Sequence, residues 1–229
     1  MLLDFLFPKR CIVCKSYGEY LCADCFAKLS FETYVICLVC GSGSIDGLTH
    51  PRCRTRYAID GVFCGVSYNG IAKKLVYVFK YQPYLSDTKQ VLVDLLYESL
   101  IQKELFMQAF SATSELIPIP LSTGKHRQRG YNQAKLLADG LAKKLQVPVA
   151  DILQRRKETI PQFGLTKLQR KENVKDAFAV KQKLDLQHNN TAFLIDDVLT
   201  TGSTLLEAGR MLKHAGIKKV YGITFARDQ

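Results

Sequence analysis

The C-terminal half of the chain alternates between short apolar runs and amphipathic stretches. Residues 191–195 are apolar without alternation, which is typical of a parallel strand buried on both faces. Apolar residues then recur at helical spacing from Leu205 to Ala215, and Gly216 is the predicted C-terminal cap. This pattern predicts a doubly wound α/β fold, in which the ligand lies beyond the carboxyl ends of parallel strands.

The same criteria assign the other elements of the chain. The predicted strands cover residues 60–68, 116–120, 147–153, 191–195 and 219–225. The predicted helices cover residues 71–79, 86–105, 133–145, 165–172 and 205–215. Basic loops are expected after the second and third strands, at residues 122–133 and 155–165. We therefore expect an α/β domain over residues 59–229, preceded by a small module over residues 1–58.

The cysteines are concentrated in this small module. Seven of the eight lie within residues 11–53. Together with one histidine they form four pairs with two intervening residues, namely Cys11 and Cys14, Cys22 and Cys25, Cys37 and Cys40, and His50 and Cys53. Each pair can place two ligand atoms on one metal, so the eight ligands predict two structural zinc sites with no coordination position left open.

The partners of these pairs are not determined by the spacing. Sequential pairing joins the first pair to the second, whereas interleaved ribbons join the first pair to the third. Disulfides are disfavoured because residues 1–7 do not have the order of a secretory signal, so a reducing compartment is expected. Cys64 lies in an alternating run and is predicted to be a buried strand residue.

Two acids and a hydroxyl-rich turn follow the apolar run at residues 191–195. Asp196 and Asp197 can accept hydrogen bonds from the vicinal diol of a ribose. The turn that leads into the next helix can bind a phosphate through its backbone N–H groups and hydroxyls, with residues Thr200, Thr201, Gly202, Ser203 and Thr204. This order resembles the phosphoribosyl pyrophosphate (PRPP) signature of type I phosphoribosyltransferases. The alternative is an ordinary helix cap beside two surface acids.

Composition and charge narrow the possible partners. A hydrophobic content of 47% in 229 residues suffices for one medium domain with a small appendage. The longest apolar stretches are too short to cross a bilayer, so we expect a cytoplasmic protein without membrane insertion. The net charge is +11, and residues 121–183 hold 15 Lys or Arg against 5 Asp or Glu. This segment would attract a pyrophosphate or a nucleic acid, unless it is only a solvated basic face.

The basic loops supply the candidate residues for either anion. The candidates are Ser122, Lys125, Arg127, Arg129, Arg155, Arg156 and Lys157. Arginine suits pyrophosphate because its planar fork can bind two phosphoryl oxygens at once.

Five motifs together resemble the ComF family over essentially the whole chain. They are Leu6-Phe-Pro-x-x-Cys11-x-x-Cys14, Ile117-Pro-Ile-Pro-Leu121, Arg127-Gln-Arg-Gly-Tyr-Asn-Gln-Ala134, Arg155-Arg-Lys-x-Thr-x-Pro-Gln162 with Arg170-x-x-Asn-Val-x-x-Ala-Phe178, and the PRPP motif. Only His50 departs from the family, which usually has Cys there. The resemblance implies a zinc-finger-containing protein of DNA uptake in natural transformation. It also implies PRPP with Mg²⁺, single-stranded DNA and a DNA-uptake helicase as partners.

Three functions remain open at this stage. The first is a PRPP-dependent phosphoribosyltransferase whose acceptor the sequence does not identify. The second is a non-catalytic factor that binds single-stranded DNA and uses PRPP as a regulatory ligand. The third is a nucleobase salvage phosphoribosyltransferase, which is disfavoured because those enzymes seldom need a zinc module.

Overall fold

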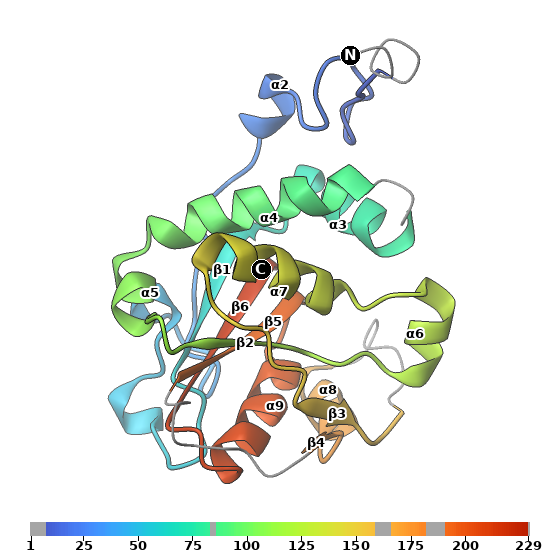
Figure 1. The fold of residues 1–229 in the computed structure, drawn as a ribbon. Coiled ribbons are helices and arrows are strands. Elements are labelled where there is room, and N and C mark those ends of the chain that lie inside the picture. The colour runs from blue at the N-terminus through green and yellow to red at the C-terminus, as the bar shows by residue number, and fades with distance from the viewer. Residues whose placement is uncertain (1–7, 83–85, 159–165, 182–190, 229) are drawn as a thin grey trace.

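The computed structural model describes residues 8–82, 86–158, 166–181 and 191–228. Within these ranges, four parallel strands form the central sheet in the order β1-β6-β5-β2 (Figure 1). The strands are β1 (Gly61–Ser67), β2 (Glu115–Pro118), β5 (Thr191–Leu199) and β6 (Lys219–Arg227). The expected parallel sheet is confirmed, and β5 extends beyond the predicted run to include both acids.

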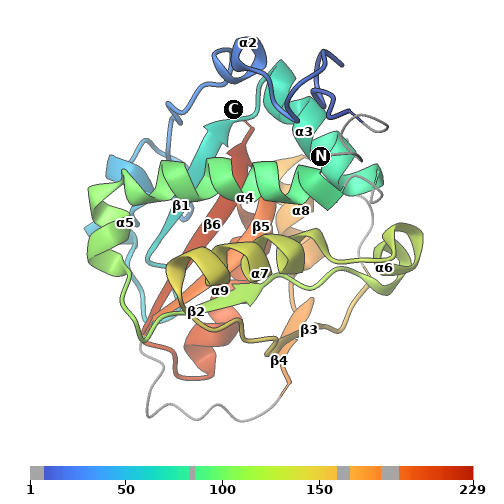
Figure 2. The same cartoon turned by 45° about the horizontal axis from the view of Figure 1, so that its top comes forward.

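Helices cover both faces of this sheet (Figures 1 and 2). One apolar core lies beneath α3 (Gly70–Tyr81), α4 (Ser86–Ile101), α5 (Glu104–Ala109) and α7 (Gln133–Leu145). The other lies beneath α9 (Ser203–His214), with a contribution from α8 (Lys167–Val174). The buried residues of β5 divide between the two cores, since Phe193 faces the first and Leu194 the second. The arrangement is therefore doubly wound, as predicted.

The strand predicted at residues 147–153 is wrong. Only one bridge forms there, between Val149 and Leu116 of β2. Pro148 has no N–H group to donate, so it cannot extend this pairing into a ladder. The chain instead forms β3 (Leu153–Arg155), which pairs antiparallel with β4 (Phe178–Val180) in a separate two-stranded sheet.

Two other predictions need correction. The helix expected over residues 86–105 is divided, because Lys103 has an extended backbone and forms the N-cap of α5. The loop expected over residues 122–133 contains the helix α6 (Thr123–Arg129). Ser122 caps its first turn, and Gly130 ends it with a φ of 78°. The helix has no apolar stripe, so hydrophobic periodicity could not reveal it.

The N-terminal module packs on both cores, and its described residues, 8–58, form three short helical elements. They are α2 (Ala23–Phe26), η1 (Ile45–Gly47) and η2 (Pro51–Cys53). Ile12 and Val13 are buried in the first core, and Leu38 is buried in the second. The segment around α2 lies over the carboxyl end of the sheet (Figure 2), where the Ser67 N–H donates to the Ser30 carbonyl at 2.8 Å.

No helix in the described part of the chain is both long enough and apolar enough to cross a bilayer.

Candidate functional site

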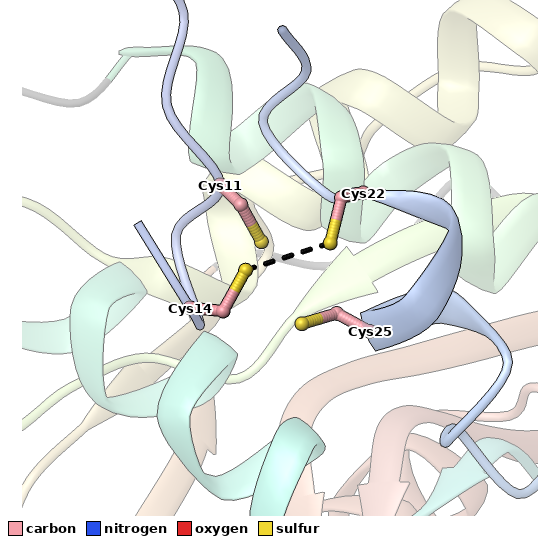
Figure 3. Close-up of side chains that lie close together, drawn as sticks. All are labelled: Cys11, Cys14, Cys22 and Cys25. Atoms are coloured by element: carbon pink, nitrogen blue, oxygen red, sulfur yellow. Dashed lines mark hydrogen bonds between the residues drawn. The ribbon is translucent and has the colours of Figure 1, made fainter. Parts of the chain in front are cut away.

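The metal-ligand pairs combine sequentially in two clusters. The first cluster contains Cys11, Cys14, Cys22 and Cys25, and the second contains Cys37, Cys40, His50 and Cys53. In each cluster all ligand atoms lie within 4.8 Å of one another. Figure 3 shows the four sulfur atoms of the first cluster pointing toward a common centre. The structure thus favours sequential over interleaved pairing.

The distances within the clusters suit tetrahedral zinc. A Zn–S bond of about 2.3 Å places two sulfurs of a tetrahedron about 3.8 Å apart. The Sγ atoms of Cys14 and Cys22 are 3.5 Å apart. In the second cluster, Nδ1 of His50 lies 3.4 Å from Sγ of Cys40, and Nε2 lies 2.9 Å from the Gly43 carbonyl. If Nε2–H donates to that carbonyl, Nδ1 is left as the metal ligand, so His50 is compatible with zinc.

The pKa values of the thiols reflect how closely the sulfurs are grouped. Burial and hydrogen bonds to neighbouring sulfurs raise the pKa of Cys25 to about 12. The same causes raise the pKa of Cys53 in the second cluster to about 11. A divalent metal offsets the repulsion among four sulfurs, so both clusters are suited to structural zinc. Cys64 is fully buried in β1 and accepts a hydrogen bond from Thr224, as expected for a strand residue.

The acid pair lies near the end of β5. The Asp197 N–H donates to Oδ1 of Asp196 at 2.8 Å. Burial and the adjacent Asp197 carboxylate raise the pKa of Asp196 to about 7. The pair can accept hydrogen bonds from a diol when both carboxyl groups are ionised.

The hydroxyl-rich turn connects this strand to α9. Gly202 is the N-cap of α9 and has a φ of 74°, a conformation that glycine adopts without steric cost. The first N–H groups of the helix and its dipole can therefore face an anion. Thr200, Ser203 and Thr204 line the adjacent pocket. The Thr201 hydroxyl instead lies 2.9 Å from the Ser203 hydroxyl, and Thr201 is not among the lining residues.

The knuckle of the second cluster that runs from Cys37 to Cys40 packs directly on this turn. Leu38 lies between the ligands Cys37 and Cys40, and its side chain is 3% exposed. A methyl group added at Gly202 would come within 2.7 Å of the Leu38 Cδ2 atom. The metal module and the candidate phosphate turn are therefore in contact, which their sequence positions did not indicate.

A single pocket of about 1000 Å³ brings the acids, the turn and several basic residues together. Its basic lining includes Lys80 from α3, Lys125 and Arg129 from α6, and Arg155 from β3. Burial lowers the pKa of Lys125, with further lowering from the charges of Arg155, Arg129 and Lys80. Cations that repel one another in a pocket form a site for a polyanion.

The other predicted basic residues lie elsewhere. Arg127, Arg156 and Lys157 are exposed and do not line the pocket. Ser122 is buried, and its hydroxyl accepts from the Lys125 N–H at 3.5 Å as a helix cap. Spacing alone could not separate these residues from the pocket cations, because the turn of α6 decides which side chains face inward.

Lys80 was not predicted to lie beside the acid pair. Its Nζ lies 2.9 Å from Oδ2 of Asp197. The attraction of this carboxylate outweighs burial and raises the pKa of Lys80. The lysine is far from Asp197 along the chain, so only the packing of α3 against the sheet reveals the contact.

Two family models match separate parts of the chain. Residues 2–55 match a double zinc ribbon domain, and residues 132–229 match a phosphoribosyl transferase domain. A weaker likeness in three dimensions relates 63% of this chain to 73% of the adenine phosphoribosyltransferase of Leishmania tarentolae, at 17% identity and a TM-score of 0.35.

Similar proteins carry names from DNA uptake and use. Competence protein F of Haemophilus influenzae is 39% identical over 46% of this chain and 46% of its own length. The DNA utilization protein YhgH of Salmonella typhimurium is 28% identical over 87% of this chain and 93% of its own length. Competence protein ComFC of Bacillus subtilis is 27% identical over 86% of this chain and 80% of its own length. The ComF resemblance is thereby confirmed, and the chain is a homologue of these competence and DNA utilization proteins, with a double zinc ribbon domain and a phosphoribosyl transferase domain.

Proposed function

We propose that this protein binds PRPP with Mg²⁺ and transfers its phosphoribosyl group to an acceptor in the cytoplasmic steps of DNA uptake. The observation that carries the proposal is the lining of the large pocket. The Asp196 and Asp197 carboxylates, a hydroxyl-rich helix N-terminus and a group of cations that includes Lys80, Lys125, Arg129 and Arg155 line it together. These groups are complementary to the ribose diol, the 5-phosphate and the pyrophosphate of PRPP, respectively.

In the proposed reaction, each group acts on a different part of PRPP. Asp196 and Asp197 accept hydrogen bonds from the ribose hydroxyls, and the first turn of α9 holds the 5-phosphate. The bond from the anomeric carbon to pyrophosphate breaks, and pyrophosphate leaves with the electron pair. The acceptor forms the new bond to that carbon and loses a proton. The pocket cations stabilise the negative charge that develops on pyrophosphate.

The donor atoms of the pocket also suit Mg²⁺. This ion prefers oxygen ligands and is usually held by substrate phosphates together with one or two carboxylates. The carboxylates of Asp196, Asp197 and Asp228 line the pocket, so they could supply such ligands. Bound with PRPP, Mg²⁺ would add positive charge at the leaving group.

A second candidate is single-stranded DNA binding with PRPP as a regulatory ligand. Tyr77 and Tyr81 also line the pocket, are 59% and 49% exposed, and have ring centroids 5.0 Å apart. Lys73 and Lys74 lie on the same helix and line the same pocket. Exposed aromatic rings beside basic residues suit the bases and phosphates of a single strand. A helicase that supplies such a strand is a further proposed partner.

The arginines of α6 offer a matched test of the pocket. Arg129 lines it, whereas Arg127 is exposed outside it. We expect Arg129→Met to weaken PRPP binding about tenfold or more, because a charged hydrogen-bond donor is lost. Arg127→Met removes the same charge but should change PRPP affinity less than twofold. Isothermal titration of both variants measures this difference.

The same pair of variants tests DNA binding. If DNA shares the pocket, Arg129→Met should lower the slope of log affinity against log salt by about 0.7 for each lost phosphate contact. An unchanged slope would place DNA on another surface. Equal PRPP affinity in both variants and the wild type would contradict the proposed pyrophosphate site.

A further inference from the structure

Lys80 forms an ion pair that occupies the candidate ribose site. Its Nζ lies 2.9 Å from Oδ2 of Asp197, and the two side chains are only 20% and 14% exposed. This is a pocket contact and not a surface pair, because both residues line the cavity. A largely buried ammonium group needs a partner, so it does not give up Asp197 unless another anion is available.

The end of α3 that carries Lys80 is anchored on both sides. The Tyr131 hydroxyl donates a hydrogen bond to the Phe79 carbonyl. The Arg129 guanidinium lies over the Tyr81 ring, 5.3 Å from its centroid. The backbone of Lys80 is thus held next to the pocket, and rotation of the flexible lysine side chain is the cheapest movement available there.

Binding of a ribose would compete with this ion pair. A diol that donates to the Asp197 carboxylate takes over the oxygen that Lys80 holds. The ammonium group would then lie beside the positive charges of Lys125 and Arg129, which already repel it. Of the groups on PRPP, the pyrophosphate carries the negative charge that relieves this repulsion.

We propose that Lys80 is a catalytic residue that pairs with Asp197 in the free protein and moves to the pyrophosphate of PRPP when the ribose hydroxyls bind Asp197. The inference rests on the proposed function above. Lys80 stays protonated throughout and stabilises the negative charge of the departing pyrophosphate. The ion pair also keeps the charge of Asp197 compensated until PRPP arrives. The exchange then gives Lys80 the pyrophosphate as its new anionic partner.

Lys80→Met tests this role with three ligands whose affinities a structural role would not separate. Inorganic pyrophosphate and PRPP should each bind at least about tenfold more weakly, because a charge-assisted contact is lost. Ribose 5-phosphate should bind as tightly as to the wild type or more tightly, because its diol no longer competes with Lys80. Loss of a residue that merely supports the pocket would weaken the binding of all three ligands together.

Three further variants complete the experiment. Lys80→Arg keeps the charge and should retain most of the pyrophosphate affinity. Lys135→Met breaks the exposed Lys135–Asp139 pair, whose N–O distance is 3.2 Å, and should change no affinity. If Lys80→Met does not fold, the double variant Lys80→Met/Asp197→Asn removes both charges, and pyrophosphate should still bind it at least tenfold more weakly.

Two results would overturn the inference in different ways. If the wild type binds pyrophosphate and Lys80→Met binds it equally well, the role of Lys80 alone is wrong. If the wild type binds neither PRPP nor pyrophosphate, the proposed function fails and the role of Lys80 fails with it.

Discussion

Replacing both acids, in Asp196→Asn/Asp197→Asn, is expected to weaken Mg²⁺-dependent PRPP binding about a hundredfold or more. Each carboxylate can accept charge-assisted hydrogen bonds from a ribose hydroxyl, and hydrogen bonds to charged groups contribute about 1.5–3 kcal/mol each. An amide offers one neutral acceptor and adds donors that a diol does not need. Isothermal titration with PRPP in the presence of Mg²⁺ measures the loss. Wild-type affinity in the double variant would contradict the ribose site.

The Asp196→Asn variant is expected to differ from the wild type in stability, by an amount that depends on pH. The pKa of this residue is about 7 in the folded protein, above its usual value of 3.8. The folded state therefore favours the protonated form, whose stabilising contribution is present below pH 3.8 and lost as the pH rises through 7. The asparagine resembles that protonated form, so the variant should melt several degrees higher than the wild type at pH 8. The difference in melting temperature should vanish near pH 4.

Removal of zinc is expected to unfold the N-terminal module and to weaken PRPP binding as well. The purified protein should hold about two zinc ions per chain, because the clusters supply two sets of four ligands. Metal binding supplies most of the folding free energy of such a small module. Once the Cys37–Cys40 knuckle is unfolded, Leu38 no longer packs against Gly202, so the phosphate turn loses a neighbour.

Metal analysis, circular dichroism and PRPP titration before and after chelation check this prediction. Cys40→Ser should lose one zinc and part of the PRPP affinity. Cys64→Ala should keep both zinc ions, because Cys64 lies outside the two clusters. A chelated protein that keeps its fold and its PRPP affinity would refute the structural role of zinc, whereas one zinc ion in the wild type would indicate that the His50 site is weak.

The central strands were predictable because their apolar runs are unambiguous. The run at residues 191–195 became β5, and the helical spacing that follows it became α9. The two-residue spacing within each cysteine pair likewise predicted metal sites, although only the fold showed that pairing is sequential. Local patterns therefore determined elements and ligands, while the partners of those ligands depended on tertiary contacts.

The rest of the site could not be predicted for the same reason. The helix α6 lacks an apolar stripe, so the sequence did not indicate that Arg129 faces the pocket while Arg127 faces away. Lys80 and Leu38 reach the acids and the phosphate turn only through the packing of other elements. In the stretch at residues 147–153, β-branched residues favoured a strand, but Pro148 limits its pairing with β2 to one bridge.

Titration of the wild-type protein with PRPP, with and without Mg²⁺, tests the central claim most directly. The pocket predicts saturable binding with a Kd below about 1 mM, within the usual range for enzyme substrates. Affinity should increase with Mg²⁺, and both ribose 5-phosphate and pyrophosphate should compete. If PRPP produces no saturable signal in a zinc-loaded, folded protein, with or without Mg²⁺, the acids, the turn and the cations do not form a PRPP site.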